Sequence, residues 1–180
     1  MNFNSIFEPF SKLKDAIKCI NISKLIPSSL PNRFTTISQV MGNDVGLNSD
    51  QVKTFLDMVD NILPQHDDDL SEADYYSIEN QFKKAEVPLR HLMPYITNCC
   101  GQDCTIKPAN KCMVFEVGGV YDGITYSGYC KVCKKTYYNS YYKEANQLYY
   151  YKSSANLLYF QSTRQSVFEV KLLKATDRDM

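Results

Sequence analysis

The sequence predicts an α+β protein, in which a helical segment over residues 1–98 precedes an antiparallel β domain over residues 99–180. Two observations lead to this prediction. In the first half of the chain apolar residues recur at three- and four-residue steps, as on one face of a helix, and after Thr105 the period changes to two, as in strands. Six of the seven cysteines lie between Cys99 and Cys133, at the start of the expected β domain.

Two helices are predicted in the first part of the chain. The first has its apolar face over residues 3–20, and we expect its regular helix to start near Pro9, which lies in the first turn, where a missing N–H costs nothing. A connector rich in turn residues follows, and residues 33–46 are weakly patterned, which indicates short strands or a loop. The second helix begins at Asn48 or Ser49, either of which can cap it, and ends at Pro64. Its buried stripe is Val52, Phe55, Leu56, Val59, Ile62 and Leu63.

An acidic loop and a third helix come next. Residues 65–70 contain three successive aspartates without the spacing of a calcium loop, so we interpret them as a solvated loop. Ser71 opens an [S/T]-x-x-[D/E] pattern, which is typical of a helix N-terminus. Pro88 and Pro94 then limit residues 87–96 to at most one or two helical turns.

The β domain is predicted to begin with a hairpin. Residues 113–117 alternate in character, and residues 124–129 return as the second strand. Gly118-Gly119 and Asp122-Gly123 supply the turn chemistry between them.

Further strands are expected toward the end of the chain. They cover residues 134–142, 148–151 and 157–160, and the last two flank a turn at residues 152–156. Ser166 repeats the helix-start pattern, so a short C-terminal helix is predicted to follow it.

The cysteines form two pairs at metal-ligand spacing. Cys100 and Cys104 make the first pair, and Cys130 and Cys133 make a C-x2-C pair twenty-five residues later. A hairpin between two such pairs brings them together, which is how a zinc ribbon is built. Soft thiolates in a closed tetrahedral site suit zinc better than calcium or magnesium. We therefore expect a zinc-ribbon-like domain that binds Zn2+ through these four cysteines.

The identity of the first ligand has an alternative. Cys99 and Cys100 both lie at an acceptable spacing from the next cysteine, and adjacent cysteines rarely reach one ion from a standard turn. Gly101 frees the backbone beside Cys100, which favours Cys100. Cys112 and Cys19 fall in a strand and a helix, and we interpret both as core residues.

Disulfide bonds are the competing interpretation of the cysteines, and they require an oxidising compartment. Residues 1–9 carry Glu8 and lack the long apolar core and cleavage site of a secretory signal. The cysteine count is also odd, which would leave one thiol unpaired. No stretch approaches the roughly 18 apolar residues of a membrane span. We expect an intracellular protein with a nuclear location and no membrane contact.

Charge and tyrosine content differ along the chain. Residues 1–98 hold 9 basic and 13 acidic side chains, whereas residues 99–180 hold 11 and 7. Eleven of the fourteen tyrosines lie between Tyr121 and Tyr159. They suit a sheet with one packed and one wet face. Alternatively, tyrosines interleaved with lysines can stack bases and neutralise phosphates. The lysines concerned are Lys131, Lys134, Lys135 and Lys143.

The segment from about Leu89 to Leu173 resembles the cysteine-cluster domains associated with KDZ transposases. The matching features are Cys100 and Cys104, the strand Met113–Gly119, Cys130-Lys-Val-Cys133, Tyr137-Tyr138, Tyr149–Tyr151, Tyr159-Phe160 and Phe168-Glu-Val170. The resemblance implies a transposon-derived zinc-binding module for recognition of DNA or protein. The transposase's catalytic acids belong to a nuclease fold, and no such fold is found in this sequence.

The function expected from the sequence is non-enzymatic. No Ser/His/Asp set, phosphate-binding glycine loop or H-E-x-x-H motif is present, and a cysteine nucleophile would need a paired histidine. We expect a zinc-stabilised module that binds DNA or a protein and has no small-molecule substrate. The alternatives are a C-x-x-C thiol or redox protein and a purely structural protein-interaction domain.

Overall fold

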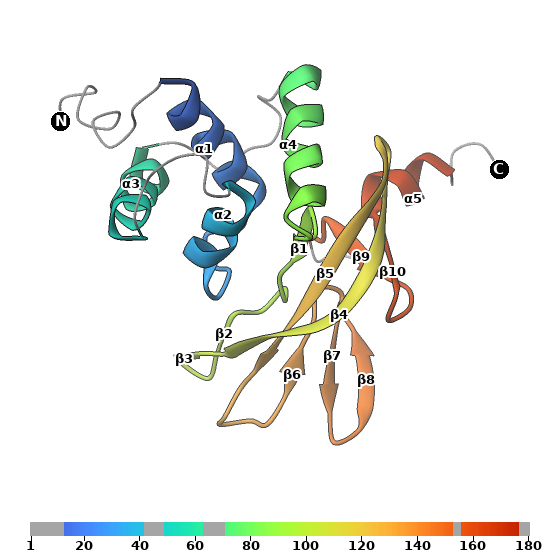
Figure 1. Cartoon of the computed structure of the whole chain (residues 1–180). Coiled ribbons are helices and arrows are strands. Elements are labelled where there is room, and N and C mark those ends of the chain that lie inside the picture. Colours follow the sequence, from blue (N-terminus) through green and yellow to red (C-terminus); the bar gives the residue numbers. More distant parts are fainter. Residues whose placement is uncertain (1–12, 42–48, 63–70, 153–155, 177–180) are drawn as a thin grey trace. The chain divides into compact units, whose positions relative to one another are not determined.

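The computed structural model describes residues 13–41, 49–62, 71–152 and 156–176. The chain divides into two compact units, residues 1–89 and 90–180 (Figure 1). The sequence placed the division between residues 98 and 99. The structure places the division nine residues nearer the N-terminus, because the strand β1, Arg90–Leu92, pairs with β5 and so belongs to the sheet. The units form an α+β protein, with helices first and a curled, mostly antiparallel sheet second, as predicted.

The first unit is helical. Its described helices are α1 (Leu13–Leu25), α2 (Arg33–Met41), α3 (Ser49–Ile62) and α4 (Glu72–Lys84). The buried side chains of its core are mainly aliphatic and aromatic, and they include Ile22, Ile26, Ile37, Phe55 and Phe82. No described helix is both long and apolar enough to cross a bilayer.

Two helix predictions are confirmed in detail. In α3, Val52, Phe55, Leu56 and Val59 are buried, as the periodicity indicated. At the start of α4, the Ser71 side chain accepts a hydrogen bond from the backbone N–H of Asp74, which satisfies one of the free amides of the first turn. Residues 13–20 of the first predicted helix lie in α1. Residues 3–12 and the acidic loop at residues 65–70 lie outside the described residues.

The expectation of strands or loop is wrong for residues 33–41, where α2 forms, and residues 42–46 lie outside the described residues. Its buried stripe begins with Arg33, an unusual core residue. The Arg33 guanidinium donates to the carbonyl oxygens of Ser23 and Ile26, at 2.9 and 3.0 Å. These carbonyls belong to the C-terminal end of α1, where backbone acceptors lack helical partners. Arg33 therefore joins α2 to α1 while keeping its charge hydrogen-bonded.

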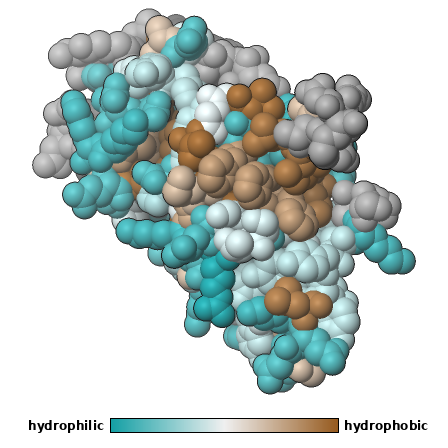
Figure 2. Space-filling model, turned by 90° about the vertical axis from the view of Figure 1, so that its right-hand side faces the viewer, coloured by the Kyte–Doolittle hydropathy of each residue, from teal (hydrophilic) through white to brown (hydrophobic). Residues whose placement is uncertain are grey.

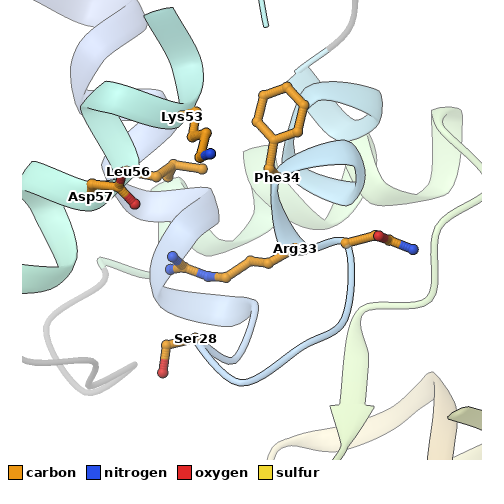
Figure 3. A pocket seen from close by; sticks show the side chains of 7 residues that line it. Ser28, Arg33, Phe34, Lys53, Leu56 and Asp57 are labelled. Carbon is orange, nitrogen blue, oxygen red and sulfur yellow. The ribbon is translucent and has the colours of Figure 1, made fainter. Parts of the chain in front are cut away.

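A pocket of about 380 Å³ lies beside this arginine (Figure 3). It is lined by Ser28, Asn32, Arg33, Phe34, Lys53, Leu56 and Asp57.

The second unit is built on a long hairpin, β4 (Thr105–Glu116) and β5 (Gly119–Tyr129). Its remaining strands are β2 (Asn98–Cys99), β3 (Gln102–Asp103), β6 (Thr136–Tyr137), β7 (Tyr141–Glu144), β8 (Gln147–Tyr150), β9 (Tyr159–Gln161) and β10 (Ser166–Glu169), followed by α5 (Val170–Thr176). The main sheet has the order β8-β7-β6-β5-β4-β10-β9, with β1 also on β5. The pairs β1–β5 and β4–β10 are parallel, and the others are antiparallel.

The hairpin differs from its prediction at the turn. The chain reverses at Val117-Gly118, and Asp122-Gly123 lies inside β5. A Cβ atom added at Gly123 would lie 2.5 Å from Cγ2 of Val114, so close packing and not a turn requires this glycine.

Three other expectations are corrected. The stretch around His91 is the strand β1 and not a helical turn, because the flanking prolines leave too few residues for helical hydrogen bonds, whereas β5 supplies partners. The strands β8 and β9 pair with β7 and β10 and not with each other. Residues 166–169 form the strand β10, and the helix starts only at Val170.

The sheet unit has two separate buried clusters. We call the first the valine core; it comprises Leu92, Cys112, Val114 and Val167, with Tyr159 packed against it. We call the second the cysteine core; it comprises Cys104, Cys130 and Tyr137, with Cys99, Cys133 and several partly buried apolar residues around it.

Apolar side chains are also exposed on the surface. Those of the sheet unit include Met113, Val117, Val120, Leu158 and Leu173. Figure 2 shows that apolar residues gather in a band on one face of the molecule.

Candidate metal centre

The first turn of the candidate centre connects β2 and β3. Its two central residues, Cys100 and Gly101, have φ values of 53° and 74°, both in the left-handed region. A two-residue hairpin loop with two positive φ values is typical of a type I′ turn, which favours glycine at its second position. This geometry places Cys99 at the end of a strand and Cys100 at the tip of the turn.

The second turn connects β5 and β6. The backbone N–H of Lys134 donates to the carbonyl of Cys130, and the N–H of Cys130 donates to the carbonyl of Lys135, both at 3.0 Å. Lys134 has a φ of 62°, which bends the chain back toward the sheet. The turn thereby presents Cys130 and Cys133 on the same side of a compact loop.

The two turns bring four cysteine sulfurs together. The Sγ atoms of Cys99, Cys100, Cys130 and Cys133 all lie within 4.8 Å of one another. Sγ of Cys99 is 3.6 Å from both Cys100 and Cys133. A tetrahedral site with metal–sulfur bonds of about 2.3 Å has sulfur–sulfur edges of about 3.8 Å. The group therefore has the dimensions needed to hold a metal ion.

Three of the predicted ligands belong to this group, namely Cys100, Cys130 and Cys133. The fourth sulfur of the group comes from Cys99, and Cys104 lies outside it. Cys104 is buried in the cysteine core, and its backbone N–H donates to the carbonyl of Thr97 at 2.8 Å. The structure thus unites both adjacent cysteines, which the sequence treated as alternatives.

A sequence signal for this arrangement exists. A two-residue loop that ends in glycine between short polar strands is compatible with a type I′ turn, because that turn needs a positive φ at both central residues. In a standard turn or an extended strand, the side chains of adjacent cysteines point in different directions. Cys100 has a left-handed backbone conformation, so this expectation does not apply to it.

The environment of the sulfurs varies. Cys130 is fully buried, Cys99 and Cys133 are half-buried, and Cys100 is exposed. A hydrogen bond from the backbone N–H of Lys135 lowers the pKa of Cys133 to about 6, so this thiol is readily deprotonated. The neighbouring cysteines raise the pKa of Cys100 to about 12, mainly through the hydrogen bond with Cys99. Closely spaced thiols oppose one another's ionisation, and a divalent cation offsets that repulsion.

A tyrosine hydroxyl also reaches the sulfur group. The hydroxyl oxygen of Tyr137 lies 2.9 Å from Sγ of Cys99 and 3.8 Å from Sγ of Cys133. Tyr137 is 5% exposed, and burial raises the pKa of its hydroxyl, which therefore keeps its proton and can donate it in a hydrogen bond.

The histidines do not join this group where the structure describes them. His91 lies in β1, and its Nδ1 atom is 3.0 Å from the hydroxyl of Tyr126. His66 and the aspartates at positions 67–69 lie outside the described residues. Among the described residues, the grouped metal-ligating side chains are thus all cysteines.

Comparison with known proteins identifies the family. The family model described as "CxC5 like cysteine cluster associated with KDZ transposases" matches residues 87–180, just over half of the chain. No curated protein and no solved structure matches the chain significantly. The matched segment contains all four grouped cysteines and the sheet that carries them. The chain therefore belongs to the CxC5-like cysteine clusters associated with KDZ transposases.

Proposed function

We propose that this protein is a non-enzymatic recognition module that binds one zinc ion and uses its tyrosine-rich sheet to contact DNA in the nucleus. The observation that carries the proposal is the convergence of four cysteine sulfurs from two turns to within 4.8 Å. Zinc is the ion that best suits four thiolates in tetrahedral geometry, since calcium and magnesium require oxygen ligands.

A structural role for the metal follows from where the cysteines lie. They connect the β2–β3 hairpin to the turn between β5 and β6. The buried cluster at this end has only three members, and two of them are cysteines. Metal binding to such sites contributes on the order of 10 kcal/mol to folding. The ion would reinforce this small, sulfur-rich core.

The position of the C-x2-C pair supports a structural and not a catalytic role. Thiol-exchange pairs lie at a helix N-terminus, where the helix dipole stabilises a reactive thiolate. Here Cys130 and Cys133 lie in a turn between two strands, and Cys130 is fully buried. A buried sulfur next to three others is better placed to ligate an ion than to attack a substrate.

Lysines and tyrosines in and near the turn between β5 and β6 support the DNA contact. Lys131 and Lys134 are exposed on the turn itself. The ammonium group of Lys135 lies 5.2 Å from the centre of the Tyr142 ring, and that ring stacks at 5.1 Å on Tyr149, which is 39% exposed. Aromatic rings beside cations are the usual means of binding single-stranded nucleic acid, because rings stack on bases and cations pair with phosphates.

A combined metal and DNA measurement tests the proposal. Elemental analysis of the purified full chain should find about one zinc per molecule, as a single four-thiolate site requires. Fluorescence anisotropy with labelled single-stranded and duplex oligonucleotides should show binding that weakens steeply as salt rises.

A matched pair of double variants locates the contact. Changing Lys131 and Lys134 to Gln should weaken DNA binding by about tenfold and reduce its salt dependence. The same change at Lys107 and Lys111, exposed lysines of β4, should leave binding within about twofold, because neither residue belongs to the turn between β5 and β6. Absence of DNA binding even at low salt would direct the search to a protein partner.

A further inference from the structure

We propose that Tyr137 is a positioning residue that makes Cys99, and not Cys104, the fourth sulfur ligand of the metal. This inference rests on the proposed metal function and concerns which of two nearby cysteines, Cys99 or Cys104, ligates the ion. The hydroxyl of Tyr137 lies 2.9 Å from the sulfur of Cys99, and Cys104 is outside the group of converging sulfurs.

The contact to Cys99 has the geometry of a charge-assisted hydrogen bond. A buried hydroxyl needs a partner, and the sulfurs of Cys99 and Cys133 are the partners of Tyr137. When Cys99 is a metal-bound thiolate, the hydroxyl is the donor and the sulfur the acceptor, and a charged acceptor strengthens the bond. Four thiolates around a divalent cation leave a net negative charge, so each donor directed at a sulfur stabilises the bound state.

Packing fixes the ring that carries this hydroxyl. Tyr137 pairs with Gly128 across β5 and β6, and Gly128 is buried. A Cβ atom at Gly128 would lie 3.3 Å from Cβ of Cys104 and 3.2 Å from Cδ1 of Ile106, so there is little free space beside the ring's strand. The Tyr142 ring packs against Tyr137 at 5.9 Å. A tyrosine has only two side-chain torsions, and these neighbours leave its hydroxyl directed at Cys99.

The surroundings of Cys104 are different. It is 7% exposed and lies within the cysteine core, against the backbone at Gly128. The Tyr137 hydroxyl contacts the sulfurs of Cys99 and Cys133, whereas Cys104 packs in the same cluster but is not among the four sulfurs that lie within 4.8 Å of one another. The environment therefore directs Cys99 to the metal and keeps Cys104 as a packing residue.

The test uses Tyr137→Phe in the full chain, with Tyr142→Phe as the matched control. Both changes remove one hydroxyl from neighbouring rings of the cysteine core, and the Tyr137 hydroxyl is the one that hydrogen-bonds to the sulfurs of Cys99 and Cys133. Competition with a chromogenic chelator should show that Tyr137→Phe binds zinc 10- to 100-fold more weakly, the usual effect of losing an outer hydrogen-bond partner. Tyr142→Phe should stay within about twofold of the wild type, since it alters no bond to a sulfur.

Cobalt substitution identifies the ligand itself. The sulfur-to-cobalt charge-transfer band reports the number of bound thiolates, so Cys99→Ser should reduce it by about a quarter or abolish cobalt binding. Cys104→Ser should retain the full band. This second pair of variants keeps the inference testable if Tyr137→Phe folds poorly.

Two results would overturn the inference alone. They are a Tyr137→Phe protein with wild-type zinc affinity, and a Cys104→Ser protein that loses the cobalt band while Cys99→Ser keeps it. A wild-type chain that takes up neither zinc nor cobalt would overturn the proposed function and this inference together.

Discussion

The two ends of the β4–β5 hairpin are held together by different means. At one end the valine core packs Val114 against Val167 and Leu92. At the other end the buried residues are two cysteines and a tyrosine, surrounded by further sulfurs. Apolar side chains fill the first end, whereas the second end brings together four sulfurs whose spacing fits a metal ion. One sheet thus combines an apolar core with a sulfur-rich one.

An ion pair reinforces the end of the hairpin that carries the valine core. Arg90 donates two hydrogen bonds of 2.7 Å to the carboxylate of Glu116, and the hydroxyl of Tyr159 donates a third, also at 2.7 Å. The side chains of Arg90 and Glu116 are only 12% and 11% exposed. Since Tyr159 also packs against the valine core, the network and the core form one unit.

Removing one of the proposed metal ligands should produce the largest difference in stability between the two ends of the hairpin. Cys130→Ser should lower the zinc content from about one per chain to nearly zero, because the most buried of the four sulfurs is lost. Hydrogen exchange should then accelerate at β2, β3 and β6, and much less at β4 and β10 beside the valine core.

The control for this prediction is Cys112→Ala, which changes a buried cysteine of the valine core. It should keep its zinc. Equal zinc loss from Cys112→Ala and Cys130→Ser would show that the two clusters are not independent.

Breaking the buried ion pair should have the next largest effect. Glu116→Gln leaves the positive charge of Arg90 without its counter-ion in a largely buried site, which should cost about 3 kcal/mol of unfolding free energy. Urea unfolding of the zinc-loaded protein measures this, and zinc content should not change.

Glu144→Gln is the matched control for the ion pair. Glu144 pairs with Lys135 at 3.1 Å, but the two side chains are 43% and 27% exposed, so the loss should be below about 1 kcal/mol. If both variants lose the same stability, burial is not what makes the Arg90–Glu116 pair important.

The smallest expected effect concerns the contact between Gly123 and Val114. Gly123→Ala places a methyl group 2.5 Å from Cγ2 of Val114, which should cost about 2 kcal/mol by overpacking. The same change made in a Val114→Ala background should cost clearly less, because the opposing methyl group is gone. Additive effects in this double-mutant cycle, measured by urea unfolding, would contradict the close contact.

The sequence predicted those parts of the molecule that depend on local chemistry. The Ser71 cap and the apolar stripe of α3 follow from side chains within a few residues of each other, and both are confirmed. The metal-ligand spacing likewise located Cys100, Cys130 and Cys133, which the structure brings together. In each case the determining residues are close along the chain or joined by a single hairpin.

The features that were missed depend on partners far along the chain. Arg33 begins a buried helix stripe only because carbonyls of α1 accept its hydrogen bonds. Asp122-Gly123 resembles a turn, but the opposing Val114 requires the glycine within a strand. Ser166–Glu169 has a helix-start pattern, yet β4 and β9 supply strand partners on both sides. Tertiary contacts outweigh local preference at all three places.

The parallel pairing of β10 with β4 has a consequence for biosynthesis. Val114 leaves the ribosome early in the sheet unit, but its partner Val167 is in the last strand to be made. Until then the edge of β4 is open and its apolar side chain lacks cover, a state that favours association with other chains. The cysteine turns, by contrast, are complete once Cys133 has emerged. An ion captured at that moment would give the nascent sheet a fixed end while it awaits its final strand.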